Sequence, residues 1–215
     1  MSSFLDGKPP NRSPETKNEW GFVFIIGFFF VVLIAAEIVS DFSVAKLSIP
    51  FFFLSWIPLL IIHEFGHALM ARFLGWRVEL ISIGIGKIRA RCDIWGMPVE
   101  IRTFPISGFA CPRATDLIQP RLKDFLIYAA GPGIEVICVL GLTAFFGYSE
   151  MTTRTSDVGI IAAQTFCVAA LFGVFITLLP ITHETERGES WSDGLGMILC
   201  WKLPDEYFAQ QAYRD

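Results

Sequence analysis

The sequence predicts a membrane all-α bundle with a small β-sheet or hairpin insertion: four transmembrane helices and a short C-terminal interfacial helix. Four apolar stretches approach or exceed the ~18 residues that mark a membrane-spanning helix. The 215-residue chain is 53% hydrophobic and only 18% charged, whereas soluble domains carry about 25% charged residues. Between two of the apolar stretches, one segment alternates apolar and polar residues, as a half-buried strand does.

The first predicted span covers residues 20–39 and begins at Trp20, a residue type enriched at membrane interfaces. The preceding residues 1–19 are rich in Ser, Pro and Lys, which predicts a disordered tail. No small-residue cleavage motif follows the apolar run, so we interpret it as a span and not as a signal peptide. The second span covers residues 47–74.

Residues 78–110 have a different character. Apolar and polar residues alternate over residues 80–86 and again over residues 99–104, and residues 95–98 read Trp-Gly-Met-Pro, a turn sequence. We therefore expect two to four short strands that form a small sheet between the second and third spans.

The third predicted span covers residues 125–146 and contains Gly131, Pro132 and Gly133. Glycine and proline there should kink the helix and allow another backbone to approach closely. The fourth span covers residues 158–181.

A polar loop, residues 182–192, follows the fourth span. The apolar piece at residues 195–203 is too short to cross a bilayer, so we expect an interfacial helix there. Residues 204–215 are expected to form a C-terminal tail. One compact membrane core, residues 20–203, is the predicted domain organisation.

The most informative motif lies inside the second span and reads His63-Glu64-Phe65-Gly66-His67. This is the pattern H-E-x-x-H, and residues four apart on a helix share one face, so His63 and His67 can offer two imidazoles to one metal ion. Zinc accepts imidazole nitrogen and keeps one position open for water in catalytic sites. Glu64 lies roughly 100° round the helix, where it can act as general base and then as general acid. The alternative is a buried structural pair of histidines, although only three histidines exist in the chain.

The remaining composition narrows the ligand set and the partners. The five cysteines show no C-x-x-C spacing, so we interpret them as reduced packing residues. The third ligand is then most simply a carboxylate. No basic run interleaved with aromatic residues suggests nucleic-acid binding.

Basic residues predict the orientation in the membrane. The only basic residues of the loops 40–46 and 147–157 are Lys46 and Arg154, whereas the segment 72–124 is rich in Lys and Arg. The positive-inside rule then places both termini and the sheet in the cytoplasm. The histidine motif therefore lies in the cytoplasmic half of the second span. In a bacterium the membrane would be the inner (plasma) membrane. The basic residues of the segment are Arg72, Arg77, Lys87, Arg89, Arg91, Arg102, Arg113, Arg121 and Lys123.

Three further motifs accompany the histidine motif. They are Phe104-Pro105-Ile106-Ser107-Gly108-Phe109, then Ala130-Gly131-Pro132-Gly133, and finally Leu178-Leu179-Pro180 followed by Ser192-Asp193-Gly194. With these motifs, the chain from about residue 48 to residue 201 resembles the site-2 protease family of intramembrane zinc metalloproteases.

The resemblance implies a fold and a set of residue roles. It implies that Asp193 is the third zinc ligand beside His63 and His67, and that Glu64 is the catalytic residue. The glycine and proline motifs imply that Gly108, Gly131 and Pro132 help to position the substrate. No polar block is long enough to hold an inserted peptide-binding domain, so the chain resembles the minimal catalytic core.

At two positions where the family usually has asparagine, this chain has a different residue. They are Glu135 and Thr177. An ionisable residue deep in a span is a functional candidate by default. The resemblance places Glu135 at a substrate-positioning asparagine, and only a neutral carboxyl can donate a hydrogen bond as asparagine does. Our hypothesis is therefore a neutral Glu135; the alternative is a glutamate lining a water-filled entry cavity.

The third departure is the long spacing between Pro180 and Asp193. It leaves His183 and Glu184, which lie in the same loop, as alternatives to Asp193 for the third ligand.

The function predicted from these residues is zinc-dependent hydrolysis of a peptide bond within or near a transmembrane segment, as in regulated intramembrane proteolysis. One zinc ion per chain, a single-span membrane protein as substrate and the lipid bilayer as environment follow from this interpretation. The alternative is a catalytically inactive relative that binds membrane helices or metal without cleaving.

Overall fold

The computed structural model describes residues 31–36, 38–40, 42–185 and 188–212. The chain divides into two units, residues 1–46 and residues 47–215. The expected tail, residues 1–19, and most of the expected first span lie outside the described residues; of that span, only the short apolar helix Val31–Ser40 is described in part.

Three helices in the described part of the chain are long and apolar enough to cross a membrane. They are α2 (Ser48–Phe73), which follows the 3-10 turn η1 (Val44–Leu47), α3 (Pro120–Phe146) and α5 (Val158–Leu178). They correspond to the second, third and fourth predicted spans, so three of the four are confirmed by length and composition and the first stays a prediction.

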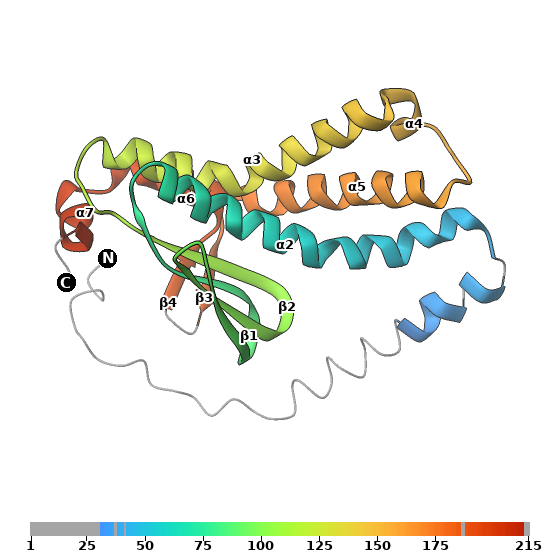
Figure 1. Cartoon of the computed structure of the whole chain (residues 1–215), viewed down its shortest axis with the longest axis horizontal. Coiled ribbons are helices and arrows are strands. Elements are labelled where there is room, and N and C mark those ends of the chain that lie inside the picture. The colour runs from blue at the N-terminus through green and yellow to red at the C-terminus, as the bar shows by residue number, and fades with distance from the viewer. Residues whose placement is uncertain (1–30, 37, 41, 186–187, 213–215) are drawn as a thin grey trace. The chain divides into compact units, whose positions relative to one another are not determined.

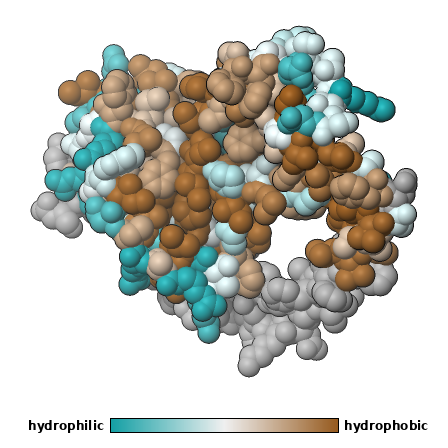
Figure 2. All heavy atoms as spheres, turned by 45° about the vertical axis from the view of Figure 1, so that its right-hand side comes forward, coloured by the Kyte–Doolittle hydropathy of each residue, from teal (hydrophilic) through white to brown (hydrophobic). Residues whose placement is uncertain are grey.

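The three helices form a bundle in which each packs against the other two, and α3 runs in the opposite direction to α2 and α5 (Figure 1). Hydrophobic side chains cover much of the face of the molecule that Figure 2 shows. Among the exposed large side chains are Phe53, Leu54 and Ile57 of α2, Ile137 and Leu140 of α3, and Leu171 and Phe175 of α5. An apolar exterior of this kind matches a lipid solvent.

Helix α3 begins earlier than the sequence predicted. The predicted span starts at residue 125, and the helix that contains it begins at Pro120, directly after Gln119 in the left-handed region with φ 47°. Proline suits the first turn of a helix, because the N–H that it lacks would have no helical partner there. The charged residues at positions 121, 123 and 124 lie outside the apolar stretch that predicted the span.

The predicted sheet is present as two long antiparallel strands, β1 (Arg77–Ile94) and β2 (Met97–Arg113), joined at Trp95 and Gly96. Both turn residues have positive φ, 54° and 76°, as a two-residue hairpin turn requires. The hairpin folds back on itself: Ile81 of β1 pairs with both Val99 and Ala110 of β2.

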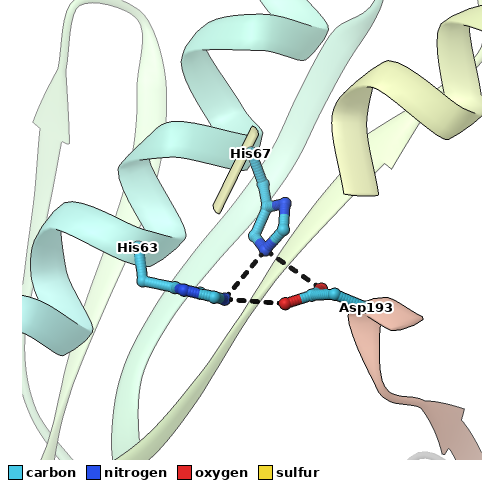
Figure 3. Close-up of side chains that lie close together, drawn as sticks. All are labelled: His63, His67 and Asp193. Carbon is cyan, nitrogen blue, oxygen red and sulfur yellow. Dashed lines mark hydrogen bonds and ion pairs between the residues drawn. The ribbon is translucent and has the colours of Figure 1, made fainter. Parts of the chain in front are cut away.

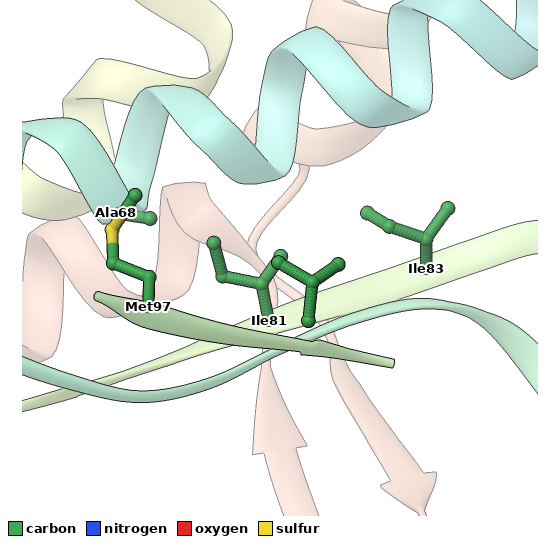
Figure 4. Close-up of a cluster of buried hydrophobic side chains, with 5 residues drawn as sticks. Ala68, Ile81, Ile83 and Met97 are labelled. Atoms are coloured by element: carbon green, nitrogen blue, oxygen red, sulfur yellow. The ribbon is translucent and has the colours of Figure 1, made fainter. Parts of the chain in front are cut away.

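Buried apolar residues attach this sheet to α2. Ala68 of α2 packs with Ile81, Ile83, Met97 and Val99 of the strands, and all five are 5% exposed or less (Figure 4). The helix that carries the histidine motif therefore rests on the sheet along its second half.

The chain between α3 and the C-terminus is more structured than predicted. The short helix α4 (Tyr148–Thr152) lies between α3 and α5, and β3 (Thr182–Thr185) and β4 (Gly188–Trp191) form a hairpin in the expected polar loop. The expected short C-terminal helix is present as α6 (Asp193–Leu199) and the 3-10 turn η2 (Cys200–Lys202).

A last helix, α7 (Asp205–Ala212), occupies the segment expected to be a tail. Its Phe208 is 1% exposed and packs with Trp76 and Ile127. Arg113 of β2 donates a hydrogen bond to the Gln211 carbonyl at 2.7 Å. The sequence did not predict this docking, because the partners of Phe208 come from distant parts of the chain.

Candidate metal centre

His63 and His67 lie on the face of α2 that points into the protein. Both residues are 7% exposed, and their Nε2 atoms lie 3.1 Å apart. The distance follows from their spacing, since residues i and i+4 are one above the other on a helix. Burial of two imidazoles in an apolar helix is costly unless their nitrogens find partners.

Asp193, the first residue of α6, joins the two histidines (Figure 3). Its carboxylate oxygens lie 2.9 Å from His63 Nε2 and 3.2 Å from His67 Nε2. One ligand atom from each residue lies within 4.8 Å of the others. Two imidazole nitrogens and one carboxylate thus converge on one point, the donor set that zinc takes in catalytic sites with an open position.

The hairpin β3–β4 explains the long spacing that precedes Asp193. The Ile181 backbone N–H donates to Ser192 Oγ at 3.1 Å, and the Ser192 N–H donates to the Ile181 carbonyl at 3.0 Å. The two ends of the hairpin therefore lie side by side. The chain returns to the end of α5 before Asp193, so the long spacing in the sequence does not separate them in space. His183 and Glu184 belong to strand β3 of this insertion.

Ser192 also fixes the orientation of α6. Its side chain accepts from the Leu195 N–H at 3.3 Å as the N-cap, and it donates to the Leu179 carbonyl at 2.6 Å. The cap satisfies an N–H that has no helical partner, and the second bond ties α6 to the end of α5.

Glycine lets the helices approach closely enough to form the site. A Cβ at Gly66 would lie 2.7 Å from the Ala130 carbonyl oxygen, and a Cβ at Gly131 would overlap the imidazoles of His63 and His67. On α6, a Cβ at Gly194 would overlap the Leu178 carbonyl. Three of the four family motifs thus contain a glycine with a steric explanation.

Helix α3 also places an oxygen atom near the Nδ1 atom of each imidazole. The Nδ1 atom of His67 lies 2.6 Å from the Ile127 carbonyl oxygen, so it donates there and leaves Nε2 as the atom that can bind a metal. The Nδ1 atom of His63 faces Glu135 Oε2 at 3.6 Å. Sequence reasoning missed Ile127 because its carbonyl belongs to the backbone, and no side-chain motif marks it.

Glu64 lies beside the three residues and not among them. It is 6% exposed and packs against Gly108 of β2, where a Cβ would lie 3.0 Å from Glu64 Oε1. The Ala110 backbone N–H is directed at the same carboxylate. The sheet therefore holds the glutamate next to the histidines.

Two other predicted residues have different surroundings. Pro132 is buried inside α3, and its missing N–H leaves the Tyr128 carbonyl without its helical donor. The Thr177 hydroxyl donates to the Val174 carbonyl of its own helix at 3.3 Å, which is a local contact outside the histidine cluster.

The cluster contains several carboxylates, whose negative charge a cation would offset. Asp193, Glu64 and Glu135 bring three carboxylates together, and in the described part of the chain Asp193 and Glu135 form their ion pairs with histidine and not with Lys or Arg. Burial opposes ionisation of Asp193, but its hydrogen bonds with both histidines lower the pKa of this carboxyl to about 2. A divalent ion would offset this buried negative charge.

The comparison with protein families gives one match. A family model described as peptidase family M50 matches residues 51–199, a range that includes the histidine motif, the sheet, α3, α5 and α6.

Several curated proteins are similar to part of the chain. "Putative zinc metalloprotease Cj1068" of Campylobacter jejuni is 30% identical over 118 residues, which cover 48% of this chain and 32% of that protein. "Putative zinc metalloprotease RC0203" of Rickettsia conorii is 32% identical over 126 residues, 49% of this chain and 35% of that protein. "Probable membrane metalloprotease ARASP2, chloroplastic" of Arabidopsis thaliana is 27% identical over 113 residues, 50% of this chain and 26% of that protein. The match spans about a third or less of each relative. These names and the His-His-Asp group support zinc as the metal.

The glycine contact at the site yields a matched pair of substitutions. Gly131→Ala should weaken zinc binding by at least about 10-fold, as disturbed ligand orientation does, because the added methyl overlaps both imidazoles. Gly133→Ala, two residues along α3, adds the same methyl group with nothing within 4 Å and should bind zinc as the parent does. Competition with a chromogenic chelator measures both affinities. Equal zinc affinity in the two variants would contradict the close approach of α3 to the histidines.

Proposed function

The chain belongs to peptidase family M50, the site-2 protease family, and on this premise we propose that it is a zinc-dependent intramembrane endopeptidase. Its reaction is hydrolysis of a peptide bond within or near a transmembrane segment of a single-span membrane protein. The observation that carries the proposal is the convergence of His63, His67 and Asp193 beside Glu64 inside apolar helices.

In this proposal His63, His67 and Asp193 hold one zinc ion per chain. Zinc with these ligands lowers the pKa of a bound water to about 7 and acts as a Lewis acid. The backbone carbonyl of Ile127 keeps the His67 ring in the orientation that presents Nε2.

Glu64 is the general base and then the general acid. Its carboxylate takes one proton from the attacking water and returns it to the leaving amine nitrogen, so that the carboxylate is regenerated at the end of the reaction. Packing against Gly108 limits the positions of this carboxylate, which favours proton transfer at a fixed place.

The substrate must expose its scissile carbonyl before attack, because a helix engages its carbonyls in hydrogen bonds. We place the unwound segment alongside β2, since Gly108 of this strand contacts Glu64. An added strand would also satisfy substrate backbone groups that lipid cannot. The Trp56 indole donates to the Ile106 carbonyl at 3.2 Å and fixes this part of β2 to α2.

Metal binding and catalysis should separate. Glu64→Gln should keep about one zinc per chain and reduce cleavage by at least about 100-fold, because general acid–base catalysis contributes about 10²–10⁴-fold. His67→Ala should lose both zinc and cleavage. Zinc content and cleavage of co-expressed single-span proteins measure the two properties.

The same experiment decides between the proposed protease and a non-cleaving relative. A parent chain that binds zinc and cleaves none of a broad substrate panel would favour the inactive alternative. Loss of zinc from Glu64→Gln would instead make Glu64 a ligand.

The third ligand is tested by three substitutions. Asp193→Ala should lose zinc, because the variant keeps only two of the three proposed ligands, whereas Glu184→Ala and His183→Ala should keep it. Zinc content of the purified variants, with helical circular dichroism as the check on folding, decides the assignment. Zinc lost from Glu184→Ala or His183→Ala and kept by Asp193→Ala would reassign the ligand.

We further propose that both termini and the sheet lie on the cytoplasmic side, which in a bacterium is that of the inner membrane. The support is the basic segment 72–124 and the two basic residues of the opposite loops. In a cysteine-free background, outside reagents should label cysteines introduced at Ser43 and Thr153, and should not label one at Arg91. The reverse labelling pattern would invert this topology.

A further inference from the structure

Each histidine of the proposed zinc site presents one ring nitrogen to the other site residues and the second to α3. His67 has a backbone partner on that side, the Ile127 carbonyl oxygen at 2.6 Å. His63 has Glu135, whose Oε2 atom lies 3.6 Å from Nδ1. Both imidazoles therefore face an oxygen atom of the same helix: a backbone carbonyl within hydrogen-bond distance of His67 and a carboxylate 3.6 Å from His63.

Glu135 is buried, and its carboxylate faces His63. The residue is 3% exposed, and in the described part of the chain its Oε2 atom has no hydrogen-bond partner. On its other side lies Gly173 of α5, where a Cβ would sit 3.5 Å from Glu135 Oε1. The carboxylate thus fills the space between α2 and α5 and has His63 as its ion-pair partner.

The ring of His63 needs an acceptor at Nδ1 if Nε2 is to bind a metal. An acceptor there keeps the ring proton on Nδ1 and leaves a lone pair on Nε2, the atom that faces His67 and Asp193. A donor at Nδ1 would have the opposite effect and place the ring proton on Nε2. Carboxylates on the far nitrogen of a metal-binding histidine fix the ring orientation and raise its basicity.

We propose that Glu135 is a positioning residue for the metal site, which accepts the Nδ1–H of His63 and holds its Nε2 toward the zinc position. This inference rests on the proposed zinc site. It differs from the neutral, substrate-positioning Glu135 that the family resemblance suggests, because in the structure the carboxylate faces the side of the imidazole away from Asp193.

Two substitutions separate the acceptor from the shape of the side chain. Glu135→Gln keeps the size and one neutral acceptor oxygen, and Glu135→Leu keeps similar bulk without an acceptor. We expect the zinc dissociation constant to rise by about 10-fold for Glu135→Gln and by up to about 100-fold for Glu135→Leu. The visible absorption bands of the cobalt-substituted protein should shift in both, since cobalt reports the ligand geometry directly.

Asp124→Asn is the matched control. Asp124 is a second buried carboxyl of α3, 9% exposed, and the substitution makes the same chemical change without touching His63. Its zinc affinity and cobalt spectrum should equal those of the parent. All measurements use the full chain in detergent, with helical circular dichroism as the check on folding; a folding failure of Glu135→Leu leaves Glu135→Gln to decide.

The outcomes distinguish this inference from the proposed function. Parent-like zinc affinity and cobalt spectra in Glu135→Gln would overturn it, and a raised KM with unchanged metal binding would assign Glu135 to the substrate instead. A parent chain that binds no zinc would overturn the proposed function, and this inference with it.

Discussion

Gly66 of α2 and Gly131 of α3 allow the two helices to approach so closely that the imidazoles of His63 and His67 lie against the α3 backbone. The rest of the site depends on this contact. It brings the Ile127 carbonyl and Glu135 close to the Nδ1 atoms of the two histidines. Helix α6 packs closely at Gly194 and places Asp193 next to the Nε2 atoms. Small residues have this use in membranes, where close van der Waals packing holds helices together.

The second constraint is electrostatic. Three carboxylates and two imidazoles share one region of low exposure inside an apolar bundle, an arrangement that would be costly without compensation. A divalent cation held by these residues would supply that compensation and the Lewis acidity that peptide hydrolysis needs. The cost of burial and the proposed activity would then have one common explanation. Glu64 of α2, which packs against Gly108 of the sheet, is the proposed base.

Much of this arrangement could be predicted from the sequence, because its signals are local. The helix periodicity of His63 and His67, the length of three spans and the alternation in residues 78–110 all depend on near neighbours in the chain. The docking of α7 and the facing of Glu135 to His63 depend on distant segments, so no local pattern contains them. The spacing before Asp193 was ambiguous for a related reason: only the hydrogen bonds that close the hairpin show that its ends meet.

We propose that two imidazoles and one carboxylate bind a single zinc ion. X-ray absorption at the zinc edge of the purified, zinc-loaded chain tests it most directly, since the nearest scatterers identify the ligands. The account predicts one zinc per chain with a shell of nitrogen and oxygen at about 2.0–2.1 Å and the scattering pattern of two imidazoles. A sulfur shell at about 2.3 Å, or a spectrum without imidazole, would contradict it.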